Sequence, residues 1–171
     1  MEREEAIINR VASSSLKSID LEDYLDNRPI AAFDLKDVLF QGMILKEKDF
    51  RDFVKNNDWS VFDNHNVHIF CSADAVIPTW AYMMLVTKLQ KANLVVQGTE
   101  DDLEKALIVQ AVQKLRAENW QDAKVVIKGC GSIRNTEFAY TEIAKALVPV
   151  VSSLLYGEPC STVPVFKKPR A

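Results

Sequence analysis

The chain has 171 residues, of which 48% are hydrophobic and 26% are charged, a balance that excludes a disordered chain. A net charge of -3 gives no support to nucleic-acid binding, which usually shows as a basic patch. No export signal and no apolar run of membrane-spanning length is visible, so we expect a cytoplasmic protein without membrane contact, whose thiols are reduced. The length fits one domain, residues 1–171, ending in a basic tail at 164–171.

The hydrophobic pattern predicts helices and strands that alternate along most of the chain. In chain order we expect a helix at 3–12, an edge strand at 16–21, a strand at 30–35, a helix at 47–55, a strand at 67–71, a helix at 78–90, a strand at 94–96, a helix at 99–117, a strand at 124–128, a helix at 136–151 and a strand at 154–156. Such alternation is typical of a mostly parallel sheet with helices on both faces. We therefore expect a three-layer, Rossmann-like α/β fold, with the N-terminal strands at the edge of its sheet.

Each of the three cysteines falls at or just after the end of a predicted strand. Cys71 ends the strand at 67–71, Cys130 follows the strand at 124–128, and Cys160 comes after the strand at 154–156. Open parallel sheets bind ligands beyond the carboxyl ends of their strands. If these three strands share one parallel sheet, all three thiols emerge at the same edge.

Three thiolates and one further ligand make a tetrahedral zinc site, or hold three corners of an iron-sulfur cluster. Asp74, three residues after Cys71, and Glu158, two residues before Cys160, are candidates for the fourth ligand, as is water. The sequence contains no Cys-x-x-Cys pair, which would be the stronger metal signature. The first interpretation is therefore a metal or cluster site formed by Cys71, Cys130, Cys160 and one of these carboxylates.

Two other interpretations stay open. The helix expected at 78–90 follows Cys71, and its N-terminus would favour a thiolate that performs sulfur or acyl transfer. Alternatively, the cysteines are buried as small apolar residues, as free cysteines often are. In that case the helix at 78–90, which is almost wholly apolar at its start, lies in the core or in the interface of a homodimeric binding or scaffold protein.

Several segments together resemble a known bacterial family of unknown function, catalogued as domain of unknown function 2480. They are residues 40–42 (FQG), 45–51 (LKEKDFR), 71–82 (CSADAVIPTWAY), 126–131 (VIKGCG) and 156–164 (YGEPCSTVP). The resemblance covers nearly the whole chain, but it implies no reaction and no site residues. Its genes are expected beside iron-sulfur assembly genes, so the resemblance implies partners among the iron-sulfur assembly proteins.

Overall fold

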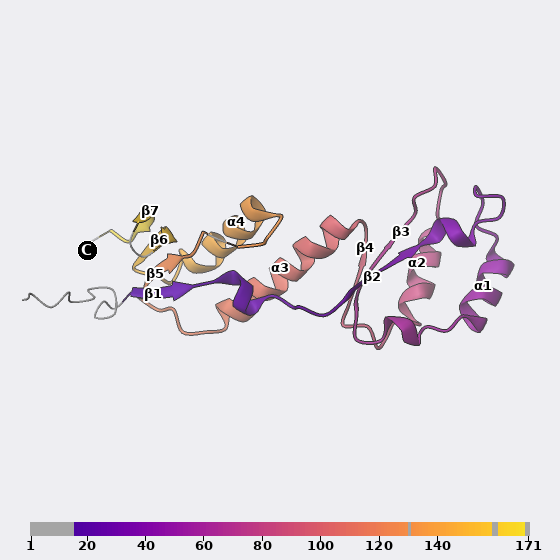
Figure 1. Ribbon diagram of the computed structural model, residues 1–171, viewed down its shortest axis with the longest axis horizontal. Helices are drawn as coiled ribbons and strands as arrows, with labels where there is room; N and C mark the ends of the chain where they lie inside the picture. Colours follow the sequence, from indigo (N-terminus) through magenta and orange to yellow (C-terminus); the bar gives the residue numbers. More distant parts are fainter. Residues whose placement is uncertain (1–15, 130, 159–160, 170–171) are drawn as a thin grey trace, which may run out of the picture. The chain divides into compact units, whose positions relative to one another are not determined.

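The computed structural model describes residues 16–129, 131–158 and 161–169 (Figure 1). The chain divides into two compact units, each with its own sheet, and the boundaries follow Leu25 and Leu107. We call Asp26–Leu107 the three-stranded unit, and the described residues before and after it the four-stranded unit. The helix expected at 3–12 lies outside the described residues.

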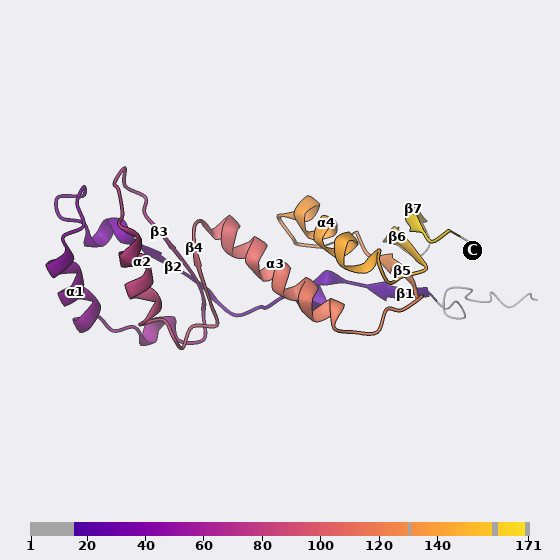
Figure 2. The ribbon, with the colours of Figure 1, turned by 180° about the vertical axis from the view of Figure 1, so that it is seen from behind.

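The three-stranded unit has a wholly parallel sheet with the strand order β2-β3-β4. Its elements are β2 (Ile30–Asp34), η2 (Leu35–Val38), α1 (Glu47–Asn56), η3 (Ser60–Phe62), β3 (Asn66–Phe70), α2 (Thr79–Val86) and β4 (Leu94–Gln97). The strands lie side by side in chain order. Right-handed crossovers therefore put α1 and α2 on the same face of the sheet (Figure 2). The core between this face and the helices includes Phe50 and Val54, one helical turn apart on α1, together with Val67 and Ile69 of β3.

The four-stranded unit has the strand order β1-β5-β6-β7, in which only β7 runs antiparallel to its neighbour. Its elements are β1 (Leu16–Ile19), η1 (Leu21–Tyr24), β5 (Lys124–Ile127), α4 (Thr136–Leu147), β6 (Ser153–Glu158) and β7 (Ser161–Lys167), with α3 (Glu100–Arg116) crossing the boundary between the units. Val125 and Ile127 of β5 pack with Ile143 and Leu147 of α4 in a second buried core.

These observations confirm an α/β fold built from mostly parallel strands. They correct the expectation that the three cysteine-bearing strands share one sheet, because β3 belongs to one sheet and β5 and β6 to the other. Residues 164–167, which we expected in a basic tail, complete β7 instead. In the part of the chain that the structure describes, no helix has the length and apolar character needed to cross a membrane.

Candidate functional site

The carboxyl edge of the three-stranded sheet is closed by a link between the ends of β2 and β3. Asp34, the last residue of β2, accepts hydrogen bonds from the Ser72 amide at 3.0 Å and from the Ser72 hydroxyl at 2.5 Å. Asp34 also precedes η2, and it accepts a hydrogen bond at 3.0 Å from the amide of Lys36 in the first turn of that helix. Partial burial opposes ionisation of Asp34, but the hydrogen bonds from Ser72 and Lys36 outweigh it and lower the pKa of this carboxyl.

Cys71 lies beside this link, on the helix-covered side of the sheet. Strand residues alternate between faces, so Cys71 follows Val67 and Ile69 toward the core, against which its half-buried side chain packs. Its thiol donates to the Ala73 carbonyl at 3.6 Å. Burial, and then the nearby charge of a Cys71 thiolate, raise the pKa of Tyr82. This thiol therefore has a packing role that needs no metal ion.

Neither histidine is placed to act as a base for Cys71. His68 lies on the opposite face of β3, where its ring stacks on Phe70 and its Nδ1 is 3.4 Å from the Gly98 carbonyl oxygen. His65 precedes β3, and six residues of extended chain separate it from Cys71 by about 20 Å. A thiol-transfer mechanism that starts from Cys71 finds no histidine partner here.

Asp74, the nearest candidate carboxylate along the chain, is exposed in the loop that joins β3 to α2. Among the described residues, no group of three or more histidine, cysteine, aspartate or glutamate side chains is arranged to hold a metal ion. The arrangement of Cys71 and Asp74 therefore adds no support to a metal site in this unit.

The other two cysteines, Cys130 and Cys160, lie outside the described residues, but the strands on either side of them are described. β5 and β6 are parallel neighbours in register, with Ile127 opposite Tyr156. Glu158 is the exposed last residue of β6 and pairs with Ser161, the first residue of β7. The β5–α4 loop and the β6–β7 turn therefore leave the same edge of the four-stranded sheet.

Polar contacts tie the β5–α4 loop to the end of β1. Glu22, in η1 after β1, accepts hydrogen bonds from the Ser132 amide at 2.5 Å and from its hydroxyl at 3.1 Å. Lys128 forms an ion pair with Asp20, with its Nζ 3.4 Å from Oδ2. These contacts join three consecutive features of the edge, namely the end of β1, the end of β5 and the loop that follows β5.

Close packing explains why glycines stand at 129 and 131. A Cβ atom on Gly129 would lie 2.8 Å from the hydroxyl of Tyr156, whose ring packs edge-on against Tyr140 at a centroid distance of 5.0 Å. A Cβ atom on Gly131 would lie 2.8 Å from Glu22 Oε1. Both positions adjoin Cys130. The side chains of Tyr156 and Glu22 lie closer to the backbone of this loop than a residue larger than glycine would permit.

Comparison with protein-family models gives one result. The model described as "Protein of unknown function (DUF2480)" matches residues 5–168. The chain belongs to this family. The match spans both units, so all three cysteines and both sheet edges lie within the DUF2480 region. No curated protein and no solved structure gives a significant match.

Several residues of these edges were not singled out from the sequence of this DUF2480 protein. Glu22 and Ser132 are 110 positions apart, and nothing in a single sequence marks such a pair. Asp34 lies near the end of the strand expected at 30–35, but its link to Ser72 depends on the pairing of β2 with β3. In the sequence Tyr156 has only the pattern of an ordinary strand residue. The structure shows that its ring fills the space beside Gly129.

Proposed function

We propose that this chain binds zinc or an iron-sulfur cluster through Cys130 and Cys160, at the carboxyl edge of the four-stranded sheet, with Glu158 as a further ligand. The observation that supports the proposal is the pairing of β5 with β6 in parallel register. Gly129 and Gly131 are bonded to Cys130, and Ser161 is bonded to Cys160. Consecutive Cα atoms are about 3.8 Å apart across a trans peptide, so the described neighbours limit where each cysteine can lie.

The chemistry of this donor set fits both kinds of centre. Two thiolates and one carboxylate would leave a fourth position of a tetrahedral zinc ion for water. An iron-sulfur cluster held by two thiolates would take its remaining ligands from a partner, and an iron-sulfur assembly protein is a partner of that kind. A role in the assembly or carriage of metal clusters follows from such an incomplete ligand set.

Cys71 and Asp74 are left out of the revised ligand set. β3 belongs to the other sheet, and the Cys71 thiol already packs in the core of the three-stranded unit and donates to Ala73. This assignment makes Cys71 a matched control for the two proposed ligands, since the same Cys→Ser substitution can be made at all three positions.

The test is elemental analysis with a visible absorption spectrum on the full chain, purified anaerobically without added metal. We expect zinc, or iron with sulfide, in the parent protein and in Cys71→Ser, and its loss in Cys130→Ser and in Cys160→Ser. Circular dichroism shows whether each variant is folded. Metal content that is the same in the parent and in the Cys130→Ser and Cys160→Ser variants, or that is lost only in Cys71→Ser, contradicts the proposal.

A second candidate function, a homodimeric binding or scaffold protein, has one observation in its favour. α2 buries Ala81 and Leu85 but leaves Met83 66% and Val86 43% exposed. Val76, just before the helix, is 91% exposed, and no charged residue occurs from 75 to 87. An exposed apolar face without charge fits the self-complementary contact of a symmetric dimer.

A further inference from the structure

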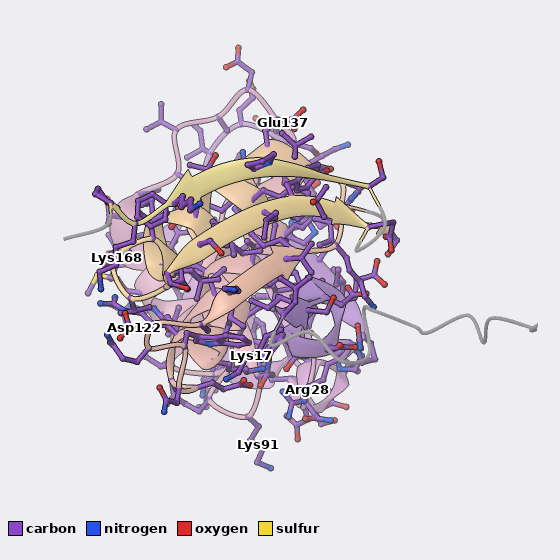
Figure 3. The ribbon with its side chains drawn as sticks, turned by 90° about the vertical axis from the view of Figure 1, so that its left-hand side faces the viewer. Lys17, Arg28, Lys91, Asp122, Glu137 and Lys168 are labelled. Atoms are coloured by element: carbon purple, nitrogen blue, oxygen red, sulfur yellow. The ribbon has the colours of Figure 1, made fainter. Side chains whose placement is uncertain are left out.

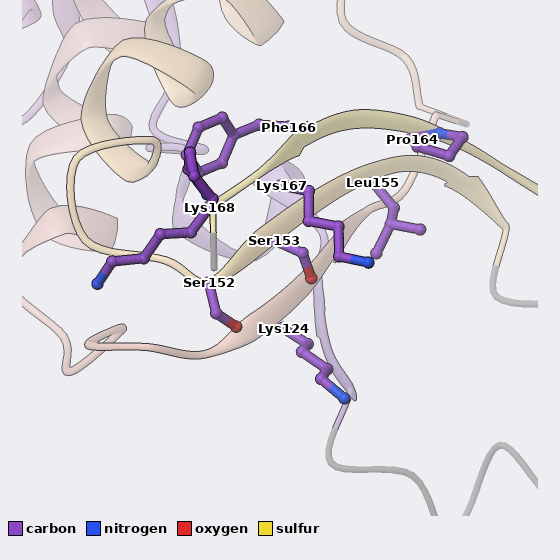
Figure 4. A pocket seen from close by; sticks show the side chains of 9 residues that line it. Lys124, Ser152, Ser153, Leu155, Pro164, Phe166, Lys167 and Lys168 are labelled. Carbon is purple, nitrogen blue, oxygen red and sulfur yellow. The ribbon is translucent and has the colours of Figure 1, made fainter. Parts of the chain in front are cut away.

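A cavity of about 590 Å³ opens at the other edge of the four-stranded sheet, where β5 and β6 begin and β7 ends (Figure 4). It is separate from the cysteine-bearing loops, which follow the opposite ends of β5 and β6. Its volume falls within the range of roughly 300–1,000 Å³ that is usual for small-molecule sites. Three lysines and two serines share its lining with apolar side chains.

Sheet register places two of these lysines on either side of one serine. Lys124 of β5 pairs with Ser153 of β6, and Ser153 pairs in turn with Lys167 of β7. Figure 4 shows the Lys124 and Lys167 side chains extending in the same general direction, with the Ser153 hydroxyl between them. Neighbouring residues in such a row are about 5 Å apart, so the two ammonium groups can reach one small anion.

The charges of the cavity are unbalanced within the described part of the chain. Lys168 is neutralised by Asp122, with Nζ 2.9 Å from Oδ1, and Figure 3 shows the two residues near each other. Among the described residues, no carboxylate pairs with Lys124 or Lys167, and none lines the cavity. Two ammonium groups that face the same space repel each other, and an anion would relieve that repulsion.

Ser152 and Ser153 differ in what their hydroxyls can offer. The Ser152 hydroxyl donates to the Ala123 carbonyl at 3.0 Å, and the Ser152 carbonyl accepts from the Lys168 amide at 2.9 Å. Ser152 therefore fixes the rim of the cavity. The Ser153 hydroxyl has no partner among the described residues, so it is free to donate to a ligand.

We propose that this cavity binds a phosphate monoester with an apolar body. Lysine ammonium groups act as point charges, and a phosphate dianion matches the charge of Lys124 and Lys167 together. The Ser153 hydroxyl donates to a phosphate oxygen. Leu155 and Pro164 are paired on β6 and β7, and they line the wall that contacts the apolar body.

Isothermal titration calorimetry on the full chain, in a buffer without phosphate and at low salt, tests this proposal with three probes. We expect phenyl phosphate to bind at least tenfold more tightly than inorganic phosphate, and benzyl alcohol to give no measurable binding. Lys124→Gln and Lys167→Gln should each weaken phenyl phosphate binding by tenfold or more. Lys88→Gln, which removes an exposed lysine of the three-stranded unit, should leave it unchanged.

Three results would overturn the proposal. The first is no heat with phenyl phosphate at millimolar concentration, and the second is equal binding of phenyl phosphate by the parent and by both lysine variants. The third is equal affinity for inorganic phosphate and phenyl phosphate, which would contradict the proposal that the ligand has an apolar body. Circular dichroism shows that each variant is folded, so a loss of binding is not a loss of structure.

Discussion

The Ser72 hydroxyl donates to Asp34 Oδ2 at 2.5 Å, and this hydrogen bond joins the ends of two parallel strands. The Ser72 amide donates to the other carboxylate oxygen of Asp34, as does the Lys36 amide. One ionised side chain therefore holds the start of η2 and the start of the β3–α2 loop against the carboxyl edge of the three-stranded sheet.

Replacing Ser72 by alanine should lower the free energy of unfolding by about 1 kcal/mol at pH 7, the usual contribution of such a hydrogen bond. The folded pKa of Asp34 is lowered, so its contribution is present above the unfolded value of about 3.9 and is lost as the pH falls through the folded pKa. Urea unfolding of the parent protein and of Ser72→Ala, at pH 7 and near pH 3, measures how much stability the substitution removes at each pH, and we expect the smaller loss near pH 3. Ser18→Ala, an exposed position on β1, is the control, and an equal loss at both pH values would contradict the prediction.

Much of the fold follows from local patterns in the sequence. The helix expected at 47–55 is α1, Glu47–Asn56, because Phe50, Phe53 and Val54 recur at helical spacing. The strands expected at 67–71 and 124–128 are β3 and β5, within one residue at each end. Strand partners were not predictable in this way, because β1 pairs with β5 across more than 100 residues and no local pattern records it.

β7 was missed for a physical reason. It lies at the edge of its sheet, so most of its residues are exposed and the alternation of buried and exposed residues is weak. It also contains Pro164, which an edge strand tolerates because one side of the strand makes no ladder hydrogen bonds. The candidate site was predictable only in part, since the glycines beside Cys130 were visible but Tyr156 and Glu22, which explain them, were not.

Gly157, near the end of β6, should be intolerant of alanine. Its φ is +117°, and an added Cβ would lie 2.6 Å from the Ser161 carbonyl oxygen. Gly157→Ala should therefore cost about 2 kcal/mol or more, measured by thermal or urea unfolding. Gly42→Ala is the matched control, because Gly42 also has a positive φ, +70°, but an added Cβ meets nothing within 4 Å. Equal costs at the two positions would show that the contact with Ser161 is unimportant.

Asn66, at the start of β3, should be the most sensitive polar position of the three-stranded unit. Its side chain is fully buried, donates to Asp26 Oδ1 at 3.1 Å and accepts from Asn93 Nδ2 at 2.7 Å. Asn66→Ala should cost about 2 kcal/mol in urea unfolding, because Asp26 and Asn93 each lose a hydrogen bond to a buried side chain. Asn56→Ala, at an exposed position in the last turn of α1, should change stability by less than about 0.5 kcal/mol.

The apolar face of α2 gives a prediction about assembly. If this face forms a symmetric dimer, Met83→Glu should convert a dimer into a monomer in sedimentation velocity, since the new charge would be buried against its own copy. Gln113→Glu introduces the same charge at an exposed position of α3 and should leave the dimer intact. A monomeric parent protein would contradict the homodimer. A dimeric Met83→Glu variant would contradict the proposal that this face of α2 forms the dimer interface.

Tyr24, in η1, should titrate at unusually high pH. Burial comes first, followed by the hydrogen bond that its hydroxyl donates to Glu118 Oε1 at 2.8 Å, and together they raise the pKa of Tyr24 to about 12. Neutral Tyr24 therefore stabilises the fold below the unfolded value of about 10, and this contribution is lost as the pH rises through the folded pKa.

Glu118→Gln removes one of the two charges that oppose ionisation of Tyr24, so the pKa of Tyr24 should fall toward 10 while burial and Asp23 keep part of the shift. Ultraviolet absorbance of tyrosinate during an alkaline titration measures it, and Tyr24→Phe identifies which transition belongs to Tyr24. Glu137→Gln, which removes an exposed carboxylate from the first turn of α4, is the control and should leave the titration unchanged. An unaltered Tyr24 transition in Glu118→Gln would mean that Glu118 contributes nothing to this pKa, and that burial and the charge of Asp23 set it.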